Sequence, residues 1–136
     1  MDDLYREEIL EHYRQPHNFG TLEHPDVVED GHNPLCGDRL RLALSFSEDG
    51  RVEDVAFTGR GCAISQASAS MLTDDIRGRP ISELEGLRGE DVLDLLGIEI
   101  SPARLKCALL SLDTLQRALR DREGDAAASI GREVRA

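Results

Sequence analysis

Cysteine is scarce in this sequence, which has three among 136 residues. The N-terminus opens with acidic residues and lacks the basic region and the apolar stretch of a secretory signal. We therefore expect a cytoplasmic protein whose thiols stay reduced. In that compartment, an odd number of irregularly spaced cysteines favours metal binding or catalysis and argues against a disulfide framework.

Basic residues are also few, because 16 lysines and arginines stand against 27 aspartates and glutamates, for a formal net charge of −11. This balance argues against a nucleic-acid partner, since a phosphate backbone requires a basic protein surface. The charge favours docking on a basic surface of another protein. No apolar run approaches the roughly 18 residues of a membrane span, so we expect a soluble protein without a membrane partner.

Alternating side chains predict a β-hairpin in the first half of the chain. The apolar residues of its first strand are Leu40, Leu42, Leu44 and Phe46. Residues 47–50 supply turn chemistry, and residues 52–58 have the pattern of the returning strand. A third strand is expected at residues 25–28. We expect the rest of residues 17–37 to form an irregular connection.

Helical spacing predicts the elements that cover this sheet. A first amphipathic helix is expected to end before Pro16, a second to cover residues 64–76, and a long one to cover residues 101–119. Shorter helical pieces are expected between the last two. The first of these pieces has Ser82 and Glu85 at the spacing of a capping box.

Together these patterns predict an α+β fold, with a small antiparallel meander of about three strands and helices packed on one of its faces. The length of the chain suits a single domain, which we place at residues 1–120. Residues 121–136 are charged and alanine-rich, contain two glycines and offer little apolar surface. They are expected to form a disordered or frayed tail.

The three cysteines stand at the predicted ends of these elements. Cys36 and Asp38 precede the first strand of the hairpin, and Cys62 follows Gly59-Arg60-Gly61 just after the second strand. Antiparallel pairing therefore brings Cys36 and Cys62 to the same edge of the sheet. Cys107 lies near the start of the long helix. We expect the three thiols and Asp38 to converge on one metal or cluster site.

Three thiols and one carboxylate supply four ligands, which suits tetrahedral zinc or the terminal positions of an iron–sulfur cluster. Oxygen is the poorer match, so Asp38 is expected to be the more exchangeable ligand. Cys62 and Cys107 stand at helix starts, where unpaired N–H groups and partial positive charge favour a thiolate. Arg104 and Lys106 precede Cys107 closely, and we expect their charge to lower its pKa.

Other interpretations of the same residues stay open. A single cysteine is more often a small buried hydrophobe than a ligand, although three of them beside glycines or helix starts favour a shared site. Gly59 and Gly61 alone are weak evidence, since such pairs form ordinary tight turns. On a helical wheel, Cys107 lies nearly opposite the apolar stripe of its helix, so we do not expect it in the core beneath that stripe.

The histidines give weaker signals. His32 is a candidate substitute ligand because it lies close to Cys36 in the sequence. His12 is expected at the surface or as a capping residue of the first helix. His17 and His24 lie in the predicted loop with no partner at a metal-binding spacing.

Four stretches form specific motifs in combination, namely residues 12–18, 33–38, 59–70 and 102–108. They resemble the U-type iron–sulfur cluster assembly proteins, the family of IscU, SufU and the N-terminal domain of NifU. The resemblance runs from about Leu4 to Leu119 and implies a SufE/NifU-like fold. It also implies that zinc, or alternatively a 2Fe–2S cluster, is bound by Cys36, Asp38, Cys62 and Cys107. A cysteine desulfurase of the SufS or IscS type is the implied partner.

The Gly-x-Gly-Cys-Ala-Ile-Ser motif and Lys106 resemble the SufU branch. That branch implies Cys36 as the acceptor of persulfide sulfur. Cys107 is the alternative acceptor, and Arg104 and Lys106 are expected to support it through their charge. SufU proteins usually carry an insertion of roughly twenty residues before the last cysteine, whereas residues 78–101 resemble the shorter IscU form. Three alternatives follow: sulfur transfer towards a downstream scaffold or apo-protein, IscU-like scaffolding of a 2Fe–2S cluster, and a structural zinc module for protein contacts.

Overall fold

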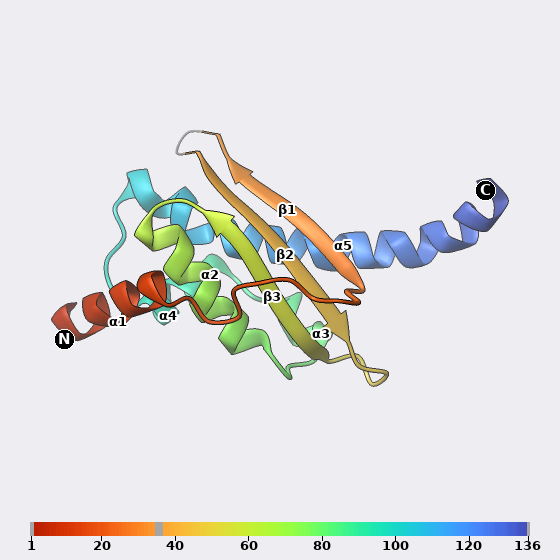
Figure 1. Ribbon diagram of the computed structural model, residues 1–136, viewed down its shortest axis with the longest axis horizontal. Coiled ribbons are helices and arrows are strands. Elements are labelled where there is room, and N and C mark those ends of the chain that lie inside the picture. The colour runs from red at the N-terminus through yellow and green to blue at the C-terminus, as the bar shows by residue number, and fades with distance from the viewer. Residues whose placement is uncertain (1, 35–36, 136) are drawn as a thin grey trace.

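The central strand is β2 (Asp38–Phe46), whose leucines are buried while the arginines between them are exposed. β1 (Val27–Asn33) and β3 (Val52–Arg60) pair with it on either side, and the antiparallel sheet has the order β1-β2-β3. This computed structural model describes residues 2–34 and 37–135, and side chains within residues 6–34 and 37–122. Figure 1 shows the resulting meander. The predicted three-stranded antiparallel meander is thus confirmed.

β1 is longer than its sequence predicts. It continues to Asn33, which pairs with Asp38 across the turn into β2. The expectation of an irregular connection is therefore wrong for residues 29–33, because this part of the strand contains no apolar side chains that would reveal its period. Gly31 fills an inward position, where a Cβ would lie 1.9 Å from Oγ1 of Thr114. That glycine allows the last helix, α5 (Leu105–Arg135), to pack directly on the strand.

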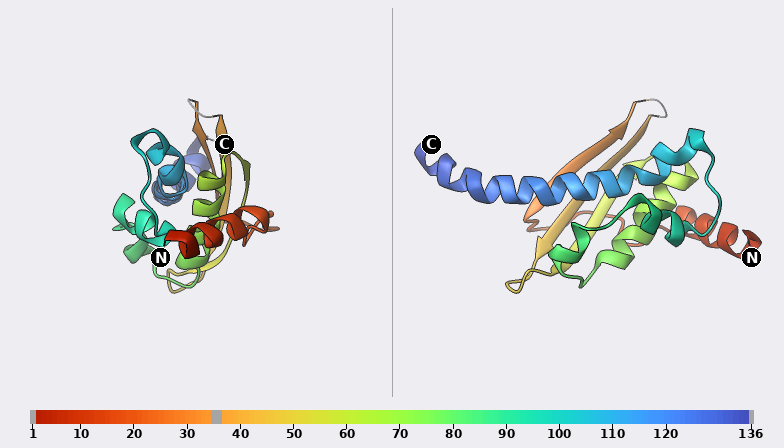
Figure 2. Two further views of the ribbon diagram at one scale, coloured as in Figure 1. Left: turned by 90° about the vertical axis from the view of Figure 1, so that its left-hand side faces the viewer. Right: turned by 180° about the vertical axis from the view of Figure 1, so that it is seen from behind.

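Two helices cover one face of the sheet. α5 contacts β1 and β2, while α2 (Ala63–Ile76) contacts β3 and also packs against α5. Figure 2 shows both helices in front of the sheet when the protein is seen from behind. α1 (Asp2–Arg14) packs along α2, and α4 (Gly89–Leu96) packs against α2 and α5. The predicted packing of helices on one face is confirmed, and the core lies between them and the sheet.

The opposite face of the sheet is crossed by the segment between α1 and β1. Backbone bonds join it to the free edge of β3, where Gly20 N–H donates to Phe57 C=O at 2.8 Å and Phe57 N–H donates to Asn18 C=O at 2.9 Å. It ends beside β1, and Figure 1 shows it passing over β3 and β2. Ala43 and Ala56, which point to this face, are buried.

The burial of α5 corrects one expectation about Cys107. Its side chain is 1% exposed, although the wheel places it opposite the apolar stripe. Leu105 and Leu109, which belong to that stripe, are only partly buried. The sheet and α2 cover α5 on different sides, so the helix buries more than one stripe and Cys107 belongs to the core.

The shorter elements show one further difference. α3 (Ile81–Leu84) begins directly after Pro80, so the capping box expected at Ser82 is wrong, and Ser82 lies exposed inside the helix. The predicted helix start at Ser101 is confirmed, with a short 3-10 turn, η1 (Pro102–Arg104), preceding α5. α5 continues to Arg135, and the proposed boundary between a domain at 1–120 and a tail stays a prediction.

Within the described part of the chain, no helix combines the length and the apolar character that a membrane crossing requires.

Candidate metal centre

Asp38, Cys62 and Cys107 converge at one end of the sheet. Each offers one potential ligand atom, and these three atoms lie within 4.8 Å of one another. They come from the first residue of β2, the N-cap position of α2 and the first turn of α5. Cys36, the fourth expected ligand, lies outside the described residues. The structure describes three of the four expected ligands, and it brings these three together.

Two glycines make room for this arrangement. A Cβ on Gly59 would lie 2.3 Å from the Arg39 carbonyl oxygen on the neighbouring strand. A Cβ on Gly61 would lie 2.3 Å from Oδ1 of Asp38 and 2.6 Å from Oγ of Ser65. The first glycine thus allows close strand pairing, and the second leaves space for the carboxylate. This local role explains the Gly-x-Gly pair without any phosphate-binding loop.

Among the three donors, the Asp38 side chain gives the clearest evidence for a bound cation. It is 1% exposed, and its Oδ1 accepts a hydrogen bond from the Cys62 backbone N–H at 3.1 Å. Its Oδ2 is buried and has no hydrogen-bond partner among the described residues. An unsatisfied buried acceptor costs about 1–3 kcal/mol. A cation held between this oxygen and the two thiols would satisfy it, so the donor set fits a borderline-soft metal.

The site opens to the surface through a pocket of about 380 Å³. Its lining residues are Asp38, Gly61, Cys62, Ala103, Arg104 and Cys107. Arg104 therefore stands where the sequence places it, beside the thiols, and it is exposed. Lys106 is also exposed but lines the neighbouring apolar pocket, with Leu105 and Pro34. Of the two expected supporting residues, Arg104 alone lines the pocket itself.

Asn33 is a site residue to which the sequence assigns no role. Its side chain is 5% exposed, and its Nδ2 lies 4.0 Å from Sγ of Cys107, a hydrogen bond to sulfur. It pairs in register with Asp38, so both side chains point inward from neighbouring strands. Outer partners of this kind orient metal ligands. The available signal was its place in the 33–38 motif, whose chemistry we attributed to the cysteine and the carboxylate alone.

Ser68 fixes the two thiol-bearing helices relative to each other. Its hydroxyl donates to the Ala108 carbonyl at 2.6 Å and lies 2.9 Å from Oγ of Ser111. These contacts join the first half of α2 to the start of α5, so they position Cys62 and Cys107 together.

The histidines differ from their sequence-based interpretation. His32 is exposed, and because Asn33 next to it points inward, β1 directs His32 to the other face of the sheet. It does not join the donor group. His12 is 8% exposed, so its expected surface position is wrong, because α1 lays this side against α2. His12, His17 and Asp74 form a second group of potential ligands, with one donor atom each within 4.8 Å.

A small antiparallel sheet with helices on one face, and a buried carboxylate beside two thiols at its end, defines an α+β protein with a candidate metal centre. The chain belongs to the family of the NifU-like N-terminal domain, whose model matches residues 4–128.

Its curated relatives include two kinds of protein. The chain is 40% identical to the zinc-dependent sulfurtransferase SufU of Bacillus subtilis, over 91% of this chain and 95% of the relative. It is 36% identical to the iron–sulfur cluster assembly enzyme IscU of Drosophila melanogaster, over 87% of this chain and 77% of the relative. The alignment to the B. subtilis protein extends over 141 positions, more than this chain's 136 residues, so that relative carries residues without a counterpart here.

Solved structures agree in fold. A putative iron–sulfur cluster assembly scaffold protein for the SUF system from Fervidobacterium islandicum superposes with a TM-score of 0.71 at 31% identity, covering 83% of this chain and 94% of that one. The N-terminal part of a nitrogen-fixing NifU-like protein from Brucella abortus gives 0.73 at 28% identity, covering 90% and 96%. These likenesses confirm the NifU-like α+β fold that the motifs implied.

Proposed function

We propose that this protein accepts persulfide sulfur from a cysteine desulfurase and passes it on for iron–sulfur cluster assembly, with zinc at the centre formed by Cys36, Asp38, Cys62 and Cys107. The observation that carries the proposal is the buried Oδ2 of Asp38, which has no hydrogen-bond partner among the described residues and lies beside two thiols. The 40% identity to a zinc-dependent sulfurtransferase supports the same metal and the same chemistry.

Zinc, when bound, stabilises the thiolate forms of its cysteine ligands, so its binding releases protons. The chain's own residues prepare this state. Cys62 occupies the N-cap position of α2, where the partial positive charge of the helix favours an anionic sulfur. Asn33 donates a hydrogen bond to the Cys107 sulfur. Asp38 ties its carboxylate to the Cys62 backbone, which holds two ligand-bearing segments together.

The transfer step is a thiol–disulfide exchange. The Cys36 thiolate attacks the terminal sulfur of the desulfurase persulfide, a new S–S bond forms on Cys36, and the desulfurase thiolate leaves as its S–S bond breaks. Asp38 would supply the oxygen ligand of a site otherwise made of sulfur, so its bond to the metal would be the easiest to exchange and would leave a coordination position open. Cys107 is the alternative acceptor, but its side chain is buried, which hinders its contact with a second protein.

The charges around the pocket suit an anionic sulfur donor. The chain as a whole carries a net charge of −11, yet Arg104 lines the pocket, and Arg60 next to Gly61 is exposed. Such a local basic rim favours approach of a persulfide anion, while the acidic remainder favours docking on a basic partner surface.

A second candidate function is scaffolding of a transient 2Fe–2S cluster, which is then the cargo. Two observations favour it. The chain is 36% identical to an IscU protein, and it lacks residues that the SufU protein of B. subtilis carries within their alignment. The same donors suit the terminal positions of a cluster. A third candidate, a structural zinc module for protein contacts, rests on the burial of the donors alone.

One experiment separates these candidates. Protein purified without chelator or histidine tag is analysed for metal and added to its own cysteine desulfurase, as wild type, Asp38→Ala and Asp113→Ala. Tightly bound zinc and faster desulfurase turnover, lost in Asp38→Ala but kept in Asp113→Ala, support sulfur transfer. Asp113 is the matched control because it is an exposed carboxylate on the same helix as Cys107.

Other results would point elsewhere. Visible absorption after anaerobic reconstitution, with transfer of the cluster to an apo-protein and no effect on turnover, would favour the scaffold. Full partner activity of a folded Asp38→Ala variant would favour the structural module and overturn the proposed role of Asp38.

A further inference from the structure

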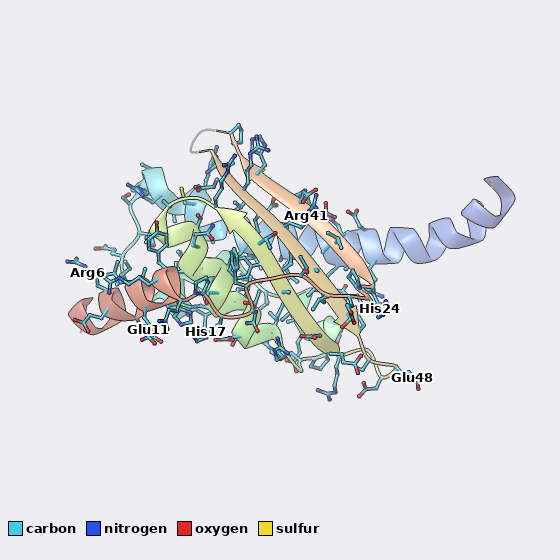
Figure 3. All side chains as sticks on the ribbon, viewed as in Figure 1. Arg6, Glu11, His17, His24, Arg41 and Glu48 are labelled. Carbon is cyan, nitrogen blue, oxygen red and sulfur yellow. The ribbon has the colours of Figure 1, made fainter. Side chains whose placement is uncertain are left out.

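A second group of metal-ligating side chains lies apart from the candidate centre, where α1 and the following segment meet α2. His12 lies in the last turns of α1, His17 follows the helix, and Asp74 lies near the C-terminal end of α2. Each offers one donor atom, and the three atoms lie within 4.8 Å of one another. The side-chain view places His17 at the end of α1, against α2 (Figure 3).

His12 and Asp74 are each held by a side chain from outside the group, and the His17 side chain is held by Asp74. Nδ1 of His12 lies 2.6 Å from Oγ of Ser70, a buried hydroxyl that also accepts the His17 backbone N–H at 2.8 Å. Oδ1 of Asp74 accepts from Nδ2 of Asn18 at 2.9 Å, and Oδ2 lies 2.5 Å from Nδ1 of His17. Outer hydrogen bonds that fix histidine rings and carboxylates are the usual second layer of a metal site.

The chemistry of the group suits a divalent transition metal. Two imidazole nitrogens and a carboxylate oxygen form a borderline donor set, which zinc, cobalt and nickel accept. The two rings lie 4.3 Å apart between centroids. Burial and the neighbouring His17 lower the pKa of His12, which favours the neutral imidazole that a metal requires. His17 and Asp74 are about half exposed, which leaves a side open for water and for entry of an ion.

We propose that His12, His17 and Asp74 form a second binding site for a divalent transition-metal ion, separate from the cysteine-containing centre. A bound ion would join α1, the segment that crosses the sheet and α2. This site is independent of the proposed sulfur transfer, because it shares no ligand with Asp38, Cys62 and Cys107.

Cobalt distinguishes the two sites, because thiolate ligands give it a charge-transfer absorption that nitrogen and oxygen ligands do not. Untagged protein is first given a single equivalent of zinc, which thiolate ligands bind in preference to nitrogen and oxygen ligands, and is then titrated with Co²⁺ alone. The proposal expects further cobalt binding with ligand-field bands but without thiolate charge transfer. His17→Gln and Asp74→Asn should each weaken this binding at least about tenfold, since even loss of an outer partner costs a metal site about 10- to 100-fold in affinity.

The matched control is His24→Gln. His24 is exposed and lies in the same connecting segment, but at its far end beside the start of β1 (Figure 3). This variant should bind cobalt as the wild type does. Cobalt binding weakened as much in His24→Gln as in the other two variants would overturn the site. Binding at the wild-type level in both His17→Gln and Asp74→Asn would overturn it too, as would the absence of cobalt binding to zinc-loaded protein.

Two further measurements keep this proposal distinct from the proposed function. Cys62→Ser should retain the nitrogen and oxygen cobalt spectrum, and His17→Gln should retain stimulation of the desulfurase. If the metal at the cysteine-containing centre fails to appear, the second site still predicts one cobalt ion without thiolate absorption. Loss of the cobalt spectrum in folded Cys62→Ser would show that the second group does not bind by itself.

Discussion

The two donor groups lie against the same helix, α2, but differ in how their polar atoms are satisfied. At its N-terminal end, Asp38 and Cys107 are almost fully buried, and one carboxylate oxygen has no partner among the described residues. Towards its C-terminal end, His17 and Asp74 are half exposed and hydrogen-bonded to each other. Among the described residues, the first group therefore has a buried acceptor that a cation would satisfy, whereas the polar atoms of the second group already contact one another or their neighbours. A cation should contribute far more to folding at the first group.

The largest expected effect is the response to chelation. Ligand binding stabilises a fold by about 4 kcal/mol when the ligand stands at about a thousand times its Kd. We expect a strong chelator to lower the free energy of unfolding by about that amount in zinc-loaded wild type, measured by urea denaturation. His17→Gln should retain most of this response, whereas Cys62→Ala should lose it. A larger loss of stability on chelation in Cys62→Ala than in His17→Gln would contradict this difference between the two groups.

A smaller effect is expected from the glycine that makes room for Asp38. In Gly61→Ala, the new Cβ displaces a buried carboxylate from its bond to Cys62, and overpacking of this kind costs about 1–3 kcal/mol. Zinc affinity should fall with stability, while cobalt binding at His17 should stay unchanged. Gly86→Ala is the control, since its nearest contact would be 3.6 Å away. Thermal unfolding and zinc competition measure both effects, and equal losses in the two variants would refute this role of Gly61.

Ser68 and Ser70 of α2 should affect the two groups separately, each at a smaller cost in stability than Gly61→Ala. Ser68 bonds to α5 near the thiols, and Ser70 bonds to His12. Each hydroxyl takes part in two hydrogen bonds, so each replacement by alanine should cost about 1–2 kcal/mol, at about 1 kcal/mol net for each bond. Ser68→Ala should weaken zinc binding at the first group, and Ser70→Ala should weaken cobalt binding at the second. If Ser68→Ala weakened cobalt binding, or Ser70→Ala weakened zinc binding, α2 would couple the two groups.

The smallest effect is a pH dependence carried by His12. Burial, with help from His17, lowers its pKa from 6.5 in the folded chain, despite the opposing charges of Asp74, Glu8 and Glu11. The unfolded chain then binds a proton that the folded chain does not, so stability falls as the pH drops through 6.5. Denaturation of the chelated protein between pH 8 and pH 5 should show this fall (the interval brackets the ordinary histidine pKa of about 6.5).

Glu29 changes stability with pH in the opposite direction to His12, so the experiment is carried out in a variant that lacks the Glu29 carboxylate. Burial and the carboxyl of Asp121 raise its pKa to about 7, so the folded chain holds an extra proton and stability falls as the pH rises towards 7. In a Glu29→Gln background, His12→Gln should flatten the remaining slope, whereas His24→Gln should leave it. An unchanged slope in His12→Gln would assign the pH dependence to another group.

Much of the fold, and the positions of two of the expected ligands, follow from local sequence patterns. Leu40, Leu42 and Leu44 alternate at the period of a strand, and this alternation survives in the structure because each strand has one covered face. The placement of Cys62 and Cys107 at helix starts also follows from glycine and proline signals that act over a few residues. The second half of β1 was not predicted, because glycine and asparagine fill its inward positions and no apolar residues mark the period of a strand there.

The hairpin, the helix starts and the family can be predicted from the sequence, since each depends on residues close together in the chain or on whole motifs. Which side chains are buried, and which of them meet, depends instead on how the elements pack. Cys107 is core because two elements cover α5, Asn33 reaches its sulfur because β1 pairs with β2, and His12 meets His17 and Asp74 because α1 lies along α2. Such meetings depend on contacts between distant segments, which no local period encodes.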